Sequence, residues 1–123
     1  MDGLEIRSTL SAGRGVFAAR DFSSGQVIER SPVIAMPASD VPAIKDTLLA
    51  RYSFQWAGDG VALALGYGSL YNHSSNPNCI YWTIPGEGVI EFVALVDIQA
   101  GEELRVNYNG NPKDVTPRWF DEP

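Results

Sequence analysis

The sequence of 123 residues contains one cysteine, Cys79, and one histidine, His73. A single cysteine cannot form an intramolecular disulfide, and this pair cannot complete a four-ligand zinc site without carboxylates or water. We therefore expect no disulfide and no metal. The sequence also lacks any apolar run near the roughly 20 residues that span a bilayer, and its acidic N-terminus lacks the apolar core of a secretory signal. These absences predict an intracellular protein, cytoplasmic or nuclear, with no membrane association.

Basic residues are missing from a long central stretch of the chain. No Lys or Arg occurs from residue 52 to residue 104, although six acidic residues do. The net charge of −6 therefore resides in this stretch, because the remaining acids and bases balance. An acidic field disfavours direct binding of nucleic acid and favours a cationic partner, such as a lysine-rich peptide. A solvated acidic surface that only aids solubility is the alternative.

Short strands separated by turns dominate the pattern and predict one mostly β domain over residues 1–123. Strands are expected at residues 4–6, 16–17, 27–30, 33–36, 52–56, 61–65, 79–84, 89–96 and 104–108. Pro32 is expected to divide the third strand from the fourth. The Asp59-Gly60 pair predicts a hairpin turn. One short amphipathic helix is expected to start near Ser39 or Asp40 and to end near Ala50.

The segment from Leu70 to Ile80 places polar residues between apolar flanks. Binding residues often lie on loops that a rigid scaffold holds, so this segment is a candidate site. A surface turn with a hydrogen-bonded histidine is the alternative. Further upstream, Gly13-Arg14-Gly15 permits positive φ and the close approach of a ligand, although a plain hairpin turn explains it equally well. The pattern favours a buried, structural role for Cys79.

Three motifs in order resemble those of SET-domain protein-lysine methyltransferases. Asn72-His73-Ser74 with Pro77-Asn78 resembles the central signature of that family. Upstream, residues 13–18 resemble its Gly-x-Gly-x-Phe motif, and downstream, residues 101–108 resemble its Gly-Glu-Glu-Leu-x-x-x-Tyr motif. The chain is most similar to minimal viral and bacterial members without zinc-binding flanks. The resemblance implies the SET-domain fold, with small curved β-sheets and a C-terminal strand threaded under a loop in a pseudoknot.

The resemblance also implies a cofactor, S-adenosyl-L-methionine, and a substrate, the lysine side chain of a protein or basic peptide such as a histone-like tail. The residues that would contact the cofactor are Gly13, Arg14 and Gly15 through their backbone, and Asn72, His73 and Tyr108. Tyr108 matches the active-site tyrosine beside the transferred methyl group. Tyr81 and Tyr52 match tyrosines of the lysine channel, and for Tyr52 packing in an aromatic core is equally compatible with the sequence.

The tail from about residue 109 to residue 123 is expected to act as a lid in place of a zinc-bound one. Trp119 could stack over the cofactor there, or dock as a plain anchor. A homodimer could also complete the site. The alternative function is a non-catalytic cofactor- or peptide-binding module built on the same fold.

Overall fold

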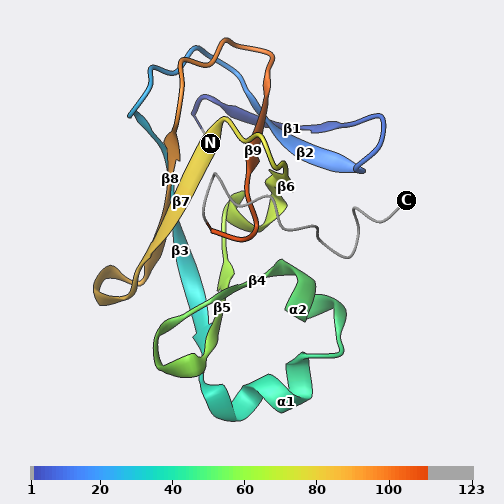
Figure 1. Cartoon of the computed structure of the whole chain (residues 1–123), viewed down its shortest axis with the longest axis vertical. Helices are drawn as coiled ribbons and strands as arrows, with labels where there is room; N and C mark the ends of the chain where they lie inside the picture. Colours follow the sequence, from blue (N-terminus) through green and yellow to red (C-terminus); the bar gives the residue numbers. More distant parts are fainter. Residues whose placement is uncertain (1, 111–123) are drawn as a thin grey trace.

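The computed structural model describes residues 2–110 and forms two sheets of short strands (Figure 1). The first sheet has the order β1 (Leu4–Ser8), β2 (Arg14–Ala18), β9 (Glu103–Val106), β6 (Asn72–His73). The second has the order β4 (Ser53–Gln55), β5 (Val61–Ala64), β3 (Val27–Met36), β8 (Val89–Ala94), β7 (Cys79–Ile84). The predicted mostly β class is confirmed.

Strand β3 is continuous over ten residues, so the prediction that Pro32 divides it is wrong. Residues 27–32 of β3 pair with β8, and residues 33–36 pair with β5. Pro32 lies where the partner strand changes, and its carbonyl accepts a hydrogen bond from the Leu65 N–H at 2.9 Å. A proline that lacks an N–H donor is tolerated at such a position, because the next residue, Val33, supplies the donor to Gly88.

The single predicted helix is also wrong, because the structure has two short helical segments instead. They are α1 (Val41–Ile44) and α2 (Leu48–Tyr52), and neither contains a buried residue. Thr47 separates them: its hydroxyl donates to the Ile44 carbonyl at 2.6 Å, which competes with continuation of the helix. Both segments lie at the end of the molecule that carries β4 and β5 (Figure 1).

The predicted turn between β4 and β5 is present. The two strands pair antiparallel, and the 3-10 helix Ala57–Asp59 connects them. Asp59 has a φ of +60°, a left-handed conformation that Asp tolerates better than most residues.

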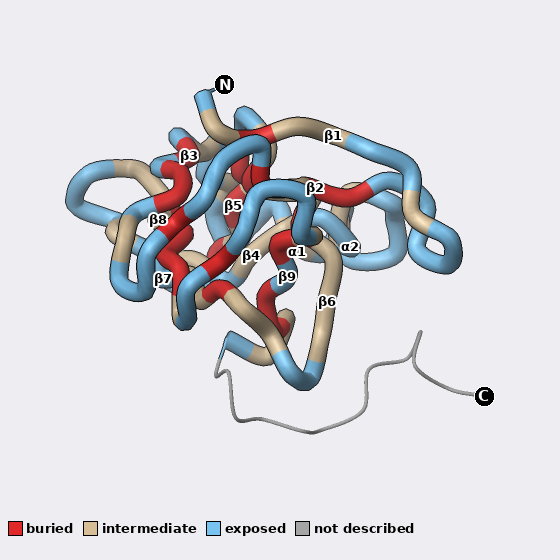
Figure 2. Tube along the Cα trace, turned by 90° about the horizontal axis from the view of Figure 1, so that it is seen from above, coloured by how far each residue is buried: buried red, intermediate tan, exposed pale blue. Residues whose placement is uncertain are grey.

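The core lies where β2, β3, β8 and β9 run through the middle of the molecule (Figure 2). Tyr71 stacks on Phe92 there, with ring centroids 4.3 Å apart and planes inclined by 12°. Cys79 is fully buried in the same cluster, which confirms the buried position expected of it.

Strand β9 joins the three sequence motifs. It pairs antiparallel with β2 and parallel with β6, so it lies between the first and the central motif. The Asn78 side chain fastens it, because its amide donates to the Glu103 carbonyl and its oxygen accepts from the Arg105 N–H, both at 2.9 Å. The C-terminal strand β9 is thus inserted between β2 and β6, as the expected pseudoknot requires.

Candidate active site

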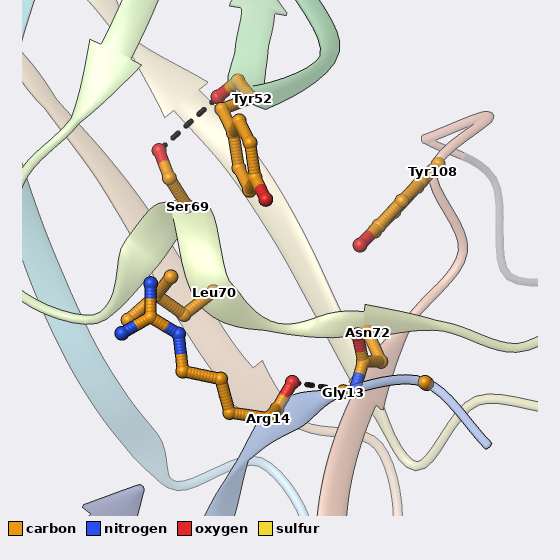
Figure 3. A pocket seen from close by; sticks show the side chains of 8 residues that line it. Gly13, Arg14, Tyr52, Ser69, Leu70, Asn72 and Tyr108 are labelled. Carbon is orange, nitrogen blue, oxygen red and sulfur yellow. Dashed lines mark hydrogen bonds between the residues drawn. The ribbon is translucent and has the colours of Figure 1, made fainter. Parts of the chain in front are cut away.

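A cavity of about 290 Å³ opens where the three motifs meet (Figure 3). Its lining residues are Ala12, Gly13, Arg14, Tyr52, Ser69, Leu70, Asn72 and Tyr108. Its volume lies at the lower end of the range usual for ligand pockets. The cavity thus brings together five of the residues that the sequence nominated, from the turn before β2, β2 itself, α2, β6 and the segment after β9.

Asn72 has both amide hydrogens engaged by the protein. Its Nδ2 donates to the Glu103 carboxyl at 2.8 Å and to the Arg14 carbonyl at 3.1 Å. Glu103 is held in turn by Arg105, whose guanidinium reaches it at 2.8 Å. Since an amide nitrogen carries only two hydrogens, Asn72 can offer a ligand only its carbonyl oxygen. An acceptor of this kind suits a cationic group such as an ammonium.

Gly15 lies beside the cavity without lining it, and the structure gives a packing reason for the glycine. A Cβ at Gly15 would lie 2.4 Å from the Glu103 carboxyl and 2.8 Å from the Asn72 amide nitrogen. Gly13 differs, because its φ is +71° and a Cβ there would have no neighbour within 4 Å. Thr9 closes this hairpin, since its hydroxyl donates to the Gly13 carbonyl at 2.7 Å. Gly13 therefore exposes its backbone to the cavity, whereas Gly15 makes room for a side-chain pair.

Tyr108 is fixed at both its hydroxyl and its backbone. The hydroxyl donates to the Tyr71 carbonyl at 2.6 Å, and the backbone N–H donates to His73 Nδ1 at 2.9 Å. The His73 ring lies 5.2 Å from the Tyr108 ring, measured between centroids. Because Nδ1 accepts a hydrogen bond, it carries no proton. The His73 side chain thus supports Tyr108 and does not line the cavity.

The two predicted channel tyrosines are placed differently. Tyr52 is 42% exposed and lines the cavity, and its backbone carbonyl accepts from the Ser69 hydroxyl at 3.1 Å. Its hydroxyl and that of Tyr108 point into the same space from different elements (Figure 3). Tyr81 does not line this cavity. Its ring packs edge-on against Phe54 at 5.0 Å, and its hydroxyl donates to the Tyr108 carbonyl at 3.3 Å.

Glu29 is a polar residue of this region that the sequence did not reveal. It is 6% exposed and accepts from the Tyr71 hydroxyl at 2.7 Å and from the Tyr67 N–H at 2.9 Å. Burial, and then the neighbouring Glu29, raise the pKa of the Tyr71 phenol well above its ordinary value. The sequence pattern does not show that Glu29 is buried, because a register shift between Val27 and Glu29 turns both Ile28 and Glu29 inward.

The charge asymmetry of the sequence is reduced in the folded protein. Glu87 and Glu91 both pair with Arg30, at 2.7 and 3.2 Å, and Glu103 pairs with Arg105. Both arginines come from outside the stretch that lacks basic residues. Three of the six acids therefore form ion pairs, and the two arginine charges offset part of the acidic excess, which weakens the argument from charge alone for a cationic partner.

Two further expectations concern groups outside the cavity. Burial raises the pKa of the Cys79 thiol to about 12, which is incompatible with a nucleophilic thiolate near neutral pH. Trp119 and the proposed lid beyond residue 110 lie outside the described residues. Within residues 2–110, no three His, Cys, Asp or Glu side chains gather as a metal site would require, and no helix is long and apolar enough to cross a membrane.

Comparison with known proteins gives concordant matches. The model of the SET-domain family matches residues 13–109. The chain is 34% identical over 121 residues to the histone-lysine N-methyltransferase, H3 lysine-37 specific, of Schizosaccharomyces pombe, covering 97% of this chain and 78% of that protein. It is 32% identical over 127 residues to an N-lysine methyltransferase of Danio rerio, covering 91% of this chain but 37% of that protein. A crystal structure of a candidate histone methyltransferase from Plasmodium falciparum matches with a TM-score of 0.72 at 26% identity, over 88% of this chain and 98% of that one.

Proposed function

The chain belongs to the SET-domain family of protein-lysine methyltransferases, and we propose that it transfers a methyl group from S-adenosylmethionine to a lysine amine in a basic, histone-like protein segment. One observation carries the proposal: the Asn72 amide and the Tyr108 hydroxyl, each fixed by other protein groups, line one cavity together with Gly13 and Tyr52. We take residues 1–123 as a single SET domain.

The residues around the cavity fit the proposed cofactor. S-adenosylmethionine supplies a sulfonium-bound methyl group, and it carries an ammonium and a carboxylate. The Asn72 carbonyl oxygen is suited to accept from the ammonium, because both hydrogens of its amide are engaged. Gly13 leaves its side of the cavity open, so a ligand can approach its backbone. Of the remaining nominated residues, Gly15 leaves room for the Asn72–Glu103 pair, and the His73 ring accepts from the Tyr108 backbone.

Tyr108 is the residue that we assign to the methyl-transfer step. Its hydroxyl hydrogen is directed at the Tyr71 carbonyl, so toward a third group the oxygen can act only as an acceptor. It would thereby orient the lysine amine, and catalysis would rest on positioning and electrostatics. The amine must be neutral to attack, and both a nearby positive charge and partial desolvation lower the pKa of a lysine.

Aromatic rings support the choice of a lysine as the substrate group. Tyr52 and Tyr108 line the cavity, whereas Tyr81 lies outside it and contacts the backbone of Tyr108. Such rings attract a cationic side chain through cation–π interactions and pack along its aliphatic stem. The relatives named for histone lysines support a histone-like target.

The test is transfer of labelled methyl groups from S-adenosylmethionine to core histones, with Tyr108→Phe beside the unaltered chain. We expect Tyr108→Phe to lower the transfer rate at least about tenfold, roughly 1.4 kcal/mol in the barrier. The dissociation constant of Tyr108→Phe for the cofactor should stay within about threefold of that of the unaltered chain, because Asn72 is untouched. Trp82→Phe is the control, since Trp82 is 44% exposed on β7 and does not line the cavity.

The outcomes separate the alternatives. Methyl-lysine that is lost in Tyr108→Phe and kept in Trp82→Phe supports the enzyme. Calorimetric binding of the cofactor without transfer to histones or any other basic protein would favour the non-catalytic module. Absence of cofactor binding would overturn the proposal.

A further inference from the structure

Glu29 holds both ends of the segment that forms one wall of the cavity. One carboxyl oxygen accepts from the Tyr67 N–H at the start of the segment, at 2.9 Å. The other accepts from the Tyr71 hydroxyl at its end, at 2.7 Å. Ser69 and Leu70, which lie between, line the cavity, whereas Glu29 itself does not.

The same segment positions the two tyrosines that point into the cavity. The Tyr71 carbonyl accepts from the Tyr108 hydroxyl at 2.6 Å. The Ser69 hydroxyl shares its one hydrogen between the Tyr52 carbonyl at 3.1 Å and the Ala64 carbonyl at 2.9 Å. A displacement of residues 67–71 would therefore move the acceptor that orients Tyr108, and this acceptor is a backbone atom that no substitution of Tyr71 itself removes.

We propose that Glu29 is a positioning residue for methyl transfer, which acts by fixing residues 67–71 so that the Tyr71 carbonyl orients the Tyr108 hydroxyl. The inference rests on the function proposed above. Glu29 touches neither cofactor nor substrate, and no proton passes from it to Tyr108, because the link runs through a backbone carbonyl. Its contribution is geometric, and a misplacement of about 1 Å at a reacting group can cost a factor of 10² in rate.

A carboxyl group suits this position because two donors converge on it in the core. Glutamine can keep both contacts: its oxygen accepts from the Tyr67 N–H, and its nitrogen donates to the Tyr71 hydroxyl oxygen. Alanine keeps neither. Glu29→Gln is therefore the conservative variant that should rescue the loss seen in Glu29→Ala, and Tyr71→Phe removes one contact only.

The first readout separates kcat from KM. We expect Glu29→Ala to lower kcat about tenfold while KM for S-adenosylmethionine stays within about threefold, because Glu103 and Arg14 hold Asn72 independently. Glu29→Gln should retain at least a third of kcat. Ile90→Val, a truncation of the buried core on β8, is the control for a general loss of stability.

The second readout needs no activity. The chain is labelled with 3-fluorotyrosine, and the Tyr108 resonance is identified by its loss in Tyr108→Phe. We expect this resonance to shift or broaden in Glu29→Ala, or in Tyr71→Phe if Glu29→Ala does not fold, and to stay in place in Ile90→Val.

The inference is overturned if the Glu29→Ala protein, or Tyr71→Phe in its stead, keeps kcat within twofold of Ile90→Val, or if its Tyr108 resonance is unmoved. If the unaltered chain transfers no methyl group at all, the proposed function fails. The fluorine measurement then still decides whether Glu29 positions Tyr108.

Discussion

Replacing Gly15 with alanine tests why a glycine is needed beside the cavity. The φ of Gly15 is not in the left-handed region, so alanine fits the backbone there. In a strand, alanine should raise the free energy of unfolding by about 0.5–1 kcal/mol relative to glycine. The new Cβ, however, would lie 2.4 Å from the Glu103 carboxyl and 2.8 Å from the Asn72 amide nitrogen. We expect it to separate this pair, whose hydrogen bond to a charged group contributes about 1.5–3 kcal/mol. The net expectation is a destabilisation of about 1–2 kcal/mol.

Denaturant unfolding of a double-mutant cycle measures this steric conflict. Glu103→Ala removes the nearer atom, so Gly15→Ala should cost less in that background, with a coupling of about 1 kcal/mol or more. Gly13→Ala is the matched control, because its Cβ would meet nothing within 4 Å and its cost arises only from the left-handed φ, about 1–2 kcal/mol. That cost should be the same with and without Glu103→Ala.

Cofactor binding provides the second arm of the same experiment. Gly15→Ala displaces Asn72 and should weaken S-adenosylmethionine binding, measured by calorimetry. The reasoning is refuted if Gly15→Ala stabilises the chain by the 0.5–1 kcal/mol that strand propensity predicts, and if its effect is additive with Glu103→Ala. Gly15 would then serve no packing role, and direct contact with a ligand would be its remaining explanation.

Three further predictions concern buried groups. Because burial raises the pKa of Cys79 to about 12, iodoacetamide at pH 8 should alkylate it only as fast as the chain unfolds, and rapid labelling of folded protein would contradict this. The pKa of Tyr71 is raised in the folded state. The contribution of the Tyr71 phenol to stability is therefore complete below about pH 10, its unfolded pKa, and is lost as the pH rises from there toward the folded pKa. Unfolding curves of Tyr71→Phe should show a weaker loss of stability over that window. The Ser31 hydroxyl is buried without a hydrogen-bond partner among the described residues, so Ser31→Ala should be neutral or raise the free energy of unfolding by about 1–2 kcal/mol, and a loss of 1 kcal/mol would show that the hydroxyl is needed.

Local sequence patterns predicted the strands well because alternation records which face of a strand is buried. They failed where a strand partner or a side-chain hydrogen bond, which apolar alternation does not record, decides the outcome. Pro32 divides no strand, because β5 takes over from β8 as the pairing partner at that point. Thr47 ends a helix that apolar spacing alone would continue, by donating to the Ile44 carbonyl. The first effect depends on strands far along the chain, and the second on a side-chain hydrogen bond to the third residue back, which apolar spacing does not record.

The candidate site shows the same division. The resemblance of three motifs to those of the SET-domain family nominated Gly13, Asn72 and Tyr108, and the cavity does bring these residues together. Glu29 could not be nominated, because its partners lie about forty residues away and its burial depends on the register shift after Val27. Long-range pairing therefore limits sequence reasoning more at the supporting residues than at those that line the cavity.

The arrangement of the site depends on the register of one short parallel pair, β6 against β9. His73 lies opposite Val106 in that pair, and the Ser74 N–H donates to the Val106 carbonyl at 2.9 Å. A slip of one residue would turn Asn72 away from Glu103 and would remove His73 Nδ1 from the Tyr108 N–H. Two residues of pairing are too few to prevent such a slip. The Asn78 side chain supplies the missing specificity, because its amide binds the carbonyl of one β9 residue and the N–H of another. Asn78, which follows β6, thus acts on the site from outside the cavity, by fixing the register that places Tyr108 beside His73.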